Sequence, residues 1–162
     1  MDSITIQHLS WGHPDASALR EAQQLEIDVL RPRGLDIAAS AANVPIFLVA
    51  FDGTEPIACG GLRPLFSVGL PEQAEIKRMY VTPSWRASDK SKAGRNTTVA
   101  RQVLEALETV AVEHGWTNLK VETSLAMAQA RRFYEKYGYM QCALFGAYEG
   151  CEGLVCYEKS LV

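Results

Sequence analysis

Apolar positions along this chain follow two periods, and their order predicts a mixed α/β architecture. Alternating or continuously apolar runs, bounded by Gly, Pro or Asp, predict strands at residues 4–9, 45–51, 55–62, 74–81, 119–123, 139–145 and 154–159. Helical periodicity predicts a first helix over residues 15–30, a second that ends at His114-Gly115, and a third that Gly138 stops. The strands flanking the second helix should be parallel, because a helix of about four turns connects them.

The rest of the chain is organised around residues 74–107. This stretch begins with an apolar and β-branched run that Pro83 ends. It finishes with an amphipathic helix, which Thr97 or Thr98 can cap through a side-chain oxygen. The apolar face of that helix consists of Val99, Val103, Leu104, Leu107 and Ala111. In the strand over residues 74–81, side chains alternate between the two faces of the sheet. One face would carry Glu75, Lys77, Met79 and Val81, and the other Ile76, Arg78 and Tyr80.

The loop between this strand and helix is basic, with Arg86, Lys90, Lys92 and Arg95 against only Asp89. A strand, a basic loop and a helix N-terminus together favour phosphate binding. First-turn amides lack intrahelical partners and lie at the positive end of the helix dipole. The alternative is an ordinary βα unit with a solvated loop, since such units are common.

Four segments carry a resemblance to a known family. The run Arg95-Asn96-Thr97-Thr98-Val99-Ala100 resembles the Q/R-x-x-G-x-G/A signature of GNAT acetyltransferases. The strand before that signature in the family resembles EIKRMYVTPSWR here, and the helix after it resembles VARQVLEALE. The second half of the family's cofactor site resembles LKVETSLAMAQARRFYEKYGY. The chain departs from the family in having Thr98 where Gly is usual, and in an apparent insertion at residues 87–94, which we expect to be flexible.

The resemblance implies one acetyltransferase domain over residues 1–162. It implies a mixed, mostly antiparallel sheet of six to seven strands flanked by helices, with a V-shaped splay between strands 74–81 and 119–123. Its cofactor would be acetyl-coenzyme A. The cofactor-binding residues that the resemblance implies are Met79, Tyr80, Val81, Arg86, Arg95, Asn96, Thr97, Thr98, Val99, Ala100, Arg101, Phe133, Tyr134 and Lys136.

Two residues are candidates for proton transfer. Tyr134 matches the tyrosine whose hydroxyl lies by the thioester sulfur in the family, where a phenol can protonate the departing thiolate; a structural tyrosine is the alternative. Glu75 matches the position of a general-base glutamate in some members. The alternative for Glu75, Lys77 and Arg78 is partial exposure at the end of the strand, since buried charge is costly unless it is paired.

The acceptor would be a primary amine of a small molecule or peptide, acetylated by direct transfer in a ternary complex. Glu26 can bind a cationic amine, unless it is simply solvated surface, and Arg78 can anchor an acidic group. Phe145 and Tyr148, in a glycine-rich and aromatic segment, can line the acceptor pocket, unless that segment is only a hairpin loop.

Composition narrows the class further. The net charge of −3 gives no nucleic-acid signal, and no apolar run approaches the roughly 18 residues of a membrane helix. The four cysteines show no C-x-x-C pair and no metal-like spacing with histidine. We therefore expect a cytoplasmic protein without a metal, and a homodimer is compatible with the sequence. A coenzyme-A-binding module without catalysis is the main rival, whereas a dinucleotide-binding unit would need a G-x-G-x-x-G after a strand.

Overall fold

The computed structural model describes residues 4–30, 42–86 and 95–162, apart from the side chains of residues 30 and 95–98. The helices are α1 (Pro14–Leu30), α2 (Arg95–Glu113) and α3 (Ala128–Lys136). The strands are β1 (Ile4–His8), β2 (Ile46–Asp52), β3 (Glu55–Pro64), β4 (Gln73–Val81), β5 (Asn118–Ser124), β6 (Met140–Cys142) and β7 (Leu154–Ser160). The predicted insertion at 87–94 lies outside the described residues, so its flexibility stays a prediction.

The strands form one seven-stranded sheet within the described chain, in the order β1-β2-β3-β4-β5-β7-β6. Among these neighbours, every described pair is antiparallel except β4 and β5, which are parallel as their connecting helix predicts. The fold is therefore the mixed, mostly antiparallel sheet flanked by helices that the sequence predicted.

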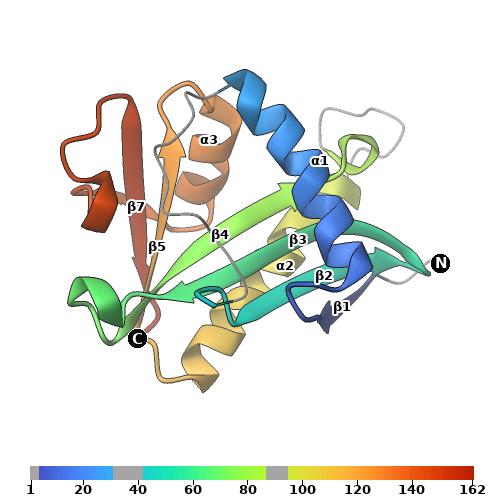
Figure 1. The fold of residues 1–162 in the computed structure, drawn as a ribbon, viewed down its shortest axis with the longest axis horizontal. Coiled ribbons are helices and arrows are strands. Elements are labelled where there is room, and N and C mark those ends of the chain that lie inside the picture. The colour runs from blue at the N-terminus through green and yellow to red at the C-terminus, as the bar shows by residue number, and fades with distance from the viewer. Residues whose placement is uncertain (1–3, 31–41, 87–94) are drawn as a thin grey trace.

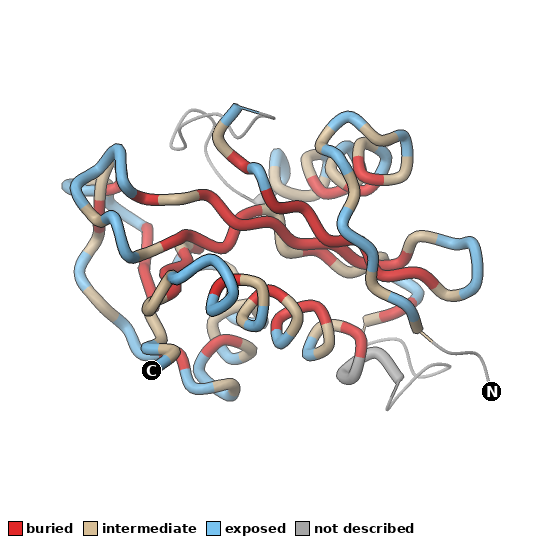
Figure 2. The backbone as a smooth tube through the Cα atoms, turned by 90° about the horizontal axis from the view of Figure 1, so that it is seen from below, coloured by how far each residue is buried: buried red, intermediate tan, exposed pale blue. Residues whose placement is uncertain are grey.

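Helices cover both faces of this sheet (Figure 1). The predicted apolar face of α2 is fully buried against the sheet, and residues of α3 join the same cluster. On the other face, Ala16 and Leu19 of α1 pack with Phe47, Val49 and Tyr80. Figure 2 shows that buried positions gather along the strands and on the side of α2 that faces them. The two apolar layers thus hold β4 between α1 and α2.

Strands β4 and β5 separate part of the way along their length. They pair from Gln73 with Asn118 to Ile76 with Val121. Beyond this point β5 continues to pair with β7 as far as Ser124, while β4 continues to Val81 beside β3. Figure 1 shows the two strands diverging toward the end of the molecule where α1 and α3 lie. This is the predicted V-shaped splay.

A β-bulge in β4 changes which side chains share a face. Tyr80 pairs with Cys59 and Lys77 with Gly61, so two residues of β4 lie opposite the single residue Gly60. Arg78 in the bulge has φ of 57°, in the left-handed region. The regular alternation predicted from the sequence is therefore wrong beyond Lys77.

The corrected faces follow from the core clusters. Ile76, Met79 and Val81 pack in the cluster that contains α2, whereas Tyr80 packs in the cluster that contains α1. Gly60 and Gly61 of β3 lie where a larger residue would clash with its neighbours. A Cβ on Gly60 would lie 2.9 Å from Leu107 Cδ1, and one on Gly61 would lie 2.9 Å from the Ile46 carbonyl oxygen. The atoms packed around this glycine pair therefore leave no room for a side chain.

Several element boundaries differ from the predictions. Helix α2 begins at Arg95, so Thr97 and Thr98 lie inside its first turn and not at the cap position. Strand β3 extends to Pro64 because its pairing with β4 continues, so Arg63, which follows the predicted strand 55–62, belongs to β3. No described helix is both long enough and apolar enough to span a membrane.

Candidate active site

A cavity of about 490 Å³ lies between α1, β4 and α3, which we call the α1–α3 pocket. Its walls come from β4 residues beyond the β4–β5 pairing and from the start of α3, so it occupies the open part of the V. The lining residues used below are Gln23, Glu26, Met79, Tyr80, Val81, Arg86, Ala100, Phe133 and Tyr134. Seven of these residues belong to the predicted cofactor-binding set, and the structure brings them together here; Ala100 is the one that α2 contributes.

Tyr134 contributes a largely buried phenol to this pocket. Its side chain is 4% exposed, and its ring makes edge contacts with Phe133 and Tyr139. Burial raises the pKa of Tyr134, and the nearby Glu122 carboxylate raises it further. Its hydroxyl makes no hydrogen bond to the described part of the chain. The phenol therefore stays protonated near neutral pH and is free to donate to a ligand in the pocket.

Arg86, Glu26 and Tyr80 join α1 to the end of β4. Arg86 Nη2 lies 2.7 Å from Glu26 Oε1 and donates to Oε2 at 2.8 Å, while its Nε donates to the Val81 carbonyl at 2.9 Å. The Tyr80 hydroxyl donates to Glu26 Oε2 at 2.6 Å. Burial raises the pKa of Tyr80 to about 12, and its hydrogen bond to Glu26 acts in the same direction. Glu26 thus lies at the pocket wall, but a cationic acceptor would have to compete with Arg86 for its carboxylate.

Gln23 is a polar residue of the pocket that sequence reasoning missed. It is 8% exposed, and its Nε2 donates to the Met79 carbonyl oxygen at 3.0 Å. Its Oε1 is buried and has no hydrogen-bond partner among the described residues. An unpaired buried amide oxygen is costly, which indicates that this group faces a position for a ligand.

The first turns of α2 hold the remaining predicted cofactor residues. The side chains of Arg95, Asn96, Thr97 and Thr98 lie outside the described residues, so their predicted contacts are untested. Val99 is fully buried in the core, which leaves only its main chain for a ligand.

Two predicted cations lie near α2 but outside the pocket. Arg101 is exposed and donates to Glu105 at 2.7 Å, and Lys136 is exposed at the end of α3. Their charged groups lie 5.9 and 5.5 Å from the centre of the Tyr137 ring. They therefore form a basic surface beside the predicted phosphate end, not part of the pocket wall.

A second cavity of about 350 Å³ lies on the α1 side of β3 and β4, and we call it the Glu75 pocket. Glu75, Phe145 and Tyr148 line it together with Arg63. All four side chains are at least nine-tenths buried. The structure therefore brings the predicted acceptor aromatics next to the predicted base, and it separates both from the pocket that contains Tyr134.

Glu75 is held by a buried polar network. Its Oε1 accepts from Arg63 Nε and Nη2 at 3.1 and 2.8 Å, and its Oε2 accepts from the Tyr148 hydroxyl at 2.6 Å. Lys77 Nζ lies 3.7 Å from Oε2 and donates to the Tyr148 hydroxyl at 3.1 Å. The alternative of partial exposure is wrong for Glu75 and Lys77, because both are buried and paired.

Arg63 is the other functional candidate that the sequence did not indicate. Its guanidinium donates to both Glu75 and Tyr148, residues 12 and 85 positions away in sequence. The signal that could have found it is the pairing of Arg63 with Glu75 across β3 and β4. That pairing depends on the length of β3, which ends at Pro64, two residues beyond the predicted end of the strand.

A family comparison identifies the class of protein as an acetyltransferase. The profile of the GNAT acetyltransferase family matches residues 9–139, so the chain belongs to that family. YsnE from Bacillus subtilis, an uncharacterised N-acetyltransferase, is 34% identical over 104 residues. That match covers 63% of this chain and 60% of the relative, so the chain spans less than two thirds of the relative's length.

Solved structures extend the similarity to the whole chain. A structure from Klebsiella pneumoniae, named as an acyl-CoA N-acyltransferase, superposes with a TM-score of 0.78 at 22% identity and covers 100% of both chains. The PaiA N-acetyltransferase of Thermoplasma acidophilum, solved with coenzyme A, gives 0.67 at 15% identity over 98% of this chain and 99% of its own. An IAA acetyltransferase from Bacillus cereus gives 0.67 at 14% identity, with the same shares covered. At these identities the likeness shows the fold alone.

Proposed function

We propose that this protein transfers an acetyl group from acetyl-coenzyme A to a primary amine of a small molecule or peptide, in a ternary complex. The observation that carries the proposal is the α1–α3 pocket at the splay of β4 and β5, with the Tyr134 phenol in its wall. Membership of the GNAT family supports acyl transfer. The nature of the acceptor and the ternary mechanism are our proposal.

The pocket fits the acyl end of such a thioester. Its volume of about 490 Å³ falls within the range of ordinary ligand sites. Main-chain groups of Met79–Val81 line it on the side of β4 that β5 no longer pairs. An extended pantetheine arm can add to this strand edge through main-chain hydrogen bonds, where the Met79 and Val81 carbonyls also accept from Gln23 and Arg86. In this proposal the first-turn amides of α2, from Asn96 to Arg101, hold the pyrophosphate.

The chemistry of the thioester is that of an activated acyl donor with a thiolate leaving group. The amine nitrogen attacks the acyl carbon, the C–N bond forms and the C–S bond breaks. The acceptor ammonium gives up two protons to solvent, and sulfur gains one proton from Tyr134, which solvent replaces, so that one proton is released overall. Main-chain amides in Met79–Val81 stabilise the negative charge that develops on the carbonyl oxygen.

Tyr134 supports the departure of sulfur in this proposal. Because burial raises the pKa of its phenol above its usual value of about 10, full proton transfer to a thiolate is uphill. A hydrogen bond from the phenol to the developing thiolate nevertheless lowers the barrier, since charge-assisted hydrogen bonds are stronger than neutral ones. Tyr134 thus acts first as a donor and then as the source of a proton that solvent replaces.

The role of Glu75 as a base remains a prediction. Both of its oxygens already accept hydrogen bonds from Arg63 and Tyr148, so an amine proton would have to displace one of these donors. Its contacts favour a positioning role, in which it holds Tyr148 and Arg63 around the Glu75 pocket. We propose that this pocket takes part of the acceptor, with Phe145 and Tyr148 in its wall.

The proposal is tested by binding and turnover measured separately. Calorimetry with coenzyme A and with acetyl-coenzyme A reports binding, and thiol release with a panel of amines reports transfer. Binding together with amine-dependent thiol release is the expected result. Binding without thiol release for any amine would favour the coenzyme-A-binding module, and the absence of binding at millimolar ligand would remove both.

A further inference from the structure

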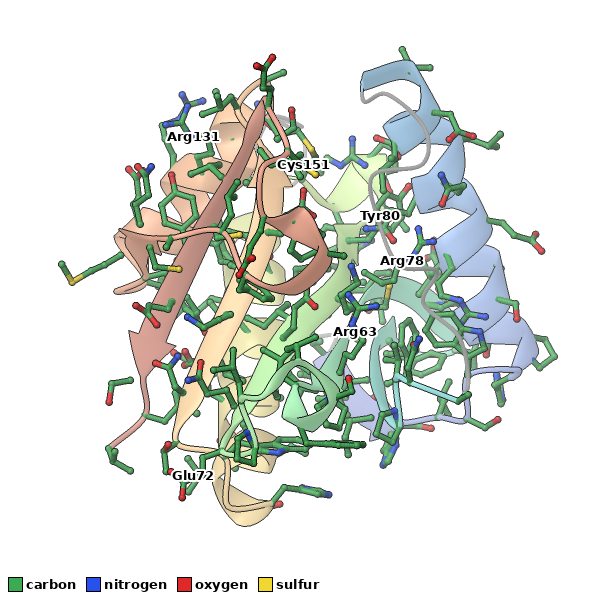
Figure 3. All side chains as sticks on the ribbon, turned by 60° about the vertical axis from the view of Figure 1, so that its left-hand side comes forward. Arg63, Glu72, Arg78, Tyr80, Arg131 and Cys151 are labelled. Atoms are coloured by element: carbon green, nitrogen blue, oxygen red, sulfur yellow. The ribbon has the colours of Figure 1, made fainter. Side chains whose placement is uncertain are left out.

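Three polar side chains lie on the α1 side of the β4 bulge, and each has polar atoms that take no part in the hydrogen-bond networks described above. They are Arg20 and Gln23, which lie one turn apart on α1, and Arg78 in the bulge itself. Figure 3 shows Arg78 between Tyr80 and Arg63, in the space between β4 and α1. This group, called the bulge cluster below, adjoins the α1–α3 pocket through Gln23.

Arg20 has one face fixed and one nitrogen free. Its guanidinium carbon lies 3.7 Å from the centre of the Trp11 ring and 5.2 Å from that of Phe47, and its Nη2 donates to Ser17 Oγ at 3.3 Å. Its Nη1 is buried without a hydrogen-bond partner among the described residues. The aromatic contacts therefore orient a cation whose donor capacity is unfilled.

Arg78 adds a second cation beside the first. Its side chain makes no hydrogen bond or ion pair with the described part of the chain, and it is only partly buried. Arg78 also holds φ of 57°, a conformation that costs energy for a residue with a Cβ and that accumulates at functional sites. Burial lowers the pKa of Arg20, and the Arg78 charge acts in the same direction. The Cys59 and Glu21 charges act on the pKa of Arg20 in the opposite direction. Two neighbouring cations favour an anion at this position.

The third group of the cluster accepts hydrogen bonds. Gln23 donates from its Nε2 to the Met79 carbonyl oxygen, and its buried Oε1 has no hydrogen-bond partner among the described residues. An amide oxygen beside Met79 can accept from an amine, and Met79 begins the segment of β4 where the proposed reaction takes place. The cluster thus combines two donors for an anion with one acceptor for an amine.

We infer that the acetyl acceptor is an α-amino acid, or a compound with the same adjacent amine and carboxylate, bound through Arg20, Arg78 and Gln23. The inference rests on the proposed function, because it assigns the acceptor of that reaction. The carboxylate binds between the two guanidinium groups, and Gln23 Oε1 orients the amine toward the acyl carbon. The step itself is the one given above, in which the C–N bond forms, the C–S bond breaks and the ammonium loses two protons.

The experiment compares amino acids with the amines that lack only the carboxylate. Thiol release from acetyl-coenzyme A is measured for the twenty amino acids and for matched decarboxylated amines, such as phenylalanine with phenethylamine and lysine with cadaverine. The expected preference in kcat/KM for the best amino acid over its amine is roughly 10- to 100-fold, the range that charge-assisted hydrogen bonds supply. In Arg78→Met the ratio falls to about one, through a higher KM for the amino acid.

Controls separate this inference from the proposed function. Arg131→Met is the matched control. Arg131 lies on α3, its Nε donates to the Tyr157 hydroxyl, and it makes no contact with the bulge cluster among the described residues. This variant should keep the wild-type ratio of kcat/KM between amino acid and amine. Calorimetry with coenzyme A checks that each variant still binds the donor. Equal rates with amines and amino acids would overturn the inference and leave the proposed function intact.

Two further outcomes also decide the matter. If coenzyme A binds but no amino acid raises the melting temperature of that complex or releases thiol, the inference is wrong. If coenzyme A itself does not bind, the proposed function fails and the inference fails with it.

Discussion

Replacing Tyr134 with Phe removes one hydroxyl and little else. In the structure the hydroxyl has no described partner, so its loss leaves no buried group unsatisfied, and the ring keeps its contacts with Phe133 and Tyr139. The free energy of unfolding should therefore change by less than about 1 kcal/mol. The catalytic effect is larger, because a hydrogen bond to a developing thiolate is lost.

The magnitude follows from the charge on the acceptor of that hydrogen bond. Hydrogen bonds to charged groups contribute about 1.5–3 kcal/mol, which corresponds to a loss in kcat of roughly 10- to 150-fold. The affinity for coenzyme A should stay within about twofold, since the interaction forms only as the C–S bond breaks. Saturating thiol-release kinetics measure kcat, and calorimetry measures the dissociation constant.

Tyr139→Phe is the matched control. It removes the same hydroxyl from a tyrosine that donates to Glu108 at 2.9 Å, so it should lower stability by about 1–3 kcal/mol and leave kcat unchanged. Because burial raises the pKa of Tyr134, wild-type kcat should show no decline from phenol ionisation below about pH 10. An unchanged kcat in Tyr134→Phe would refute the assigned role, as would a decline between about pH 8 and 10 that this variant lacks.

Three further variants test other parts of the account. Glu75→Gln breaks a buried ion pair and should lower the free energy of unfolding by about 3–5 kcal/mol in urea titrations; a change below about 1 kcal/mol would show that the network is not stabilising. Glu26→Gln should tighten coenzyme A binding severalfold in calorimetry, because it releases Arg86 for the ligand. The free energy of unfolding should change little, since the Glu26 and Arg86 side chains are 39% and 32% exposed. Weaker binding in this variant would contradict that reasoning. Gly61→Ala should destabilise by about 1–3 kcal/mol, because its Cβ would meet a carbonyl oxygen at 2.9 Å, whereas Gly12→Ala, with nothing within 4 Å, should be neutral.

The periodicity of the sequence predicted the elements well because burial on one face imposes it locally. The apolar face of α2 and the parallel pairing of β4 with β5 were both confirmed. The bulge at Arg78 was not predictable in this way, since it depends on how β4 pairs with β3. One extra residue there moves Met79 and Tyr80 to the faces opposite those predicted, which is why Tyr80 reaches Glu26 on α1.

The candidate site shows the same limit. Family motifs led to Tyr134 and Met79–Val81, which do line one pocket. They gave no indication of Gln23, because its contact with Met79 spans 56 residues and a single polar residue on an amphipathic helix reads as surface. The separation of Glu75 from that pocket likewise comes from packing, since the residues that enclose it lie on β3 and in the segment before β7.

The most direct test of the central claim is a crystal structure of this protein with acetyl-coenzyme A. The account predicts the thioester in the α1–α3 pocket, with main-chain hydrogen bonds to Met79–Val81 and the Tyr134 hydroxyl within about 3.5 Å of the sulfur. Density for the thioester in the Glu75 pocket or on another surface, with the Tyr134 hydroxyl pointing into empty solvent, would contradict it.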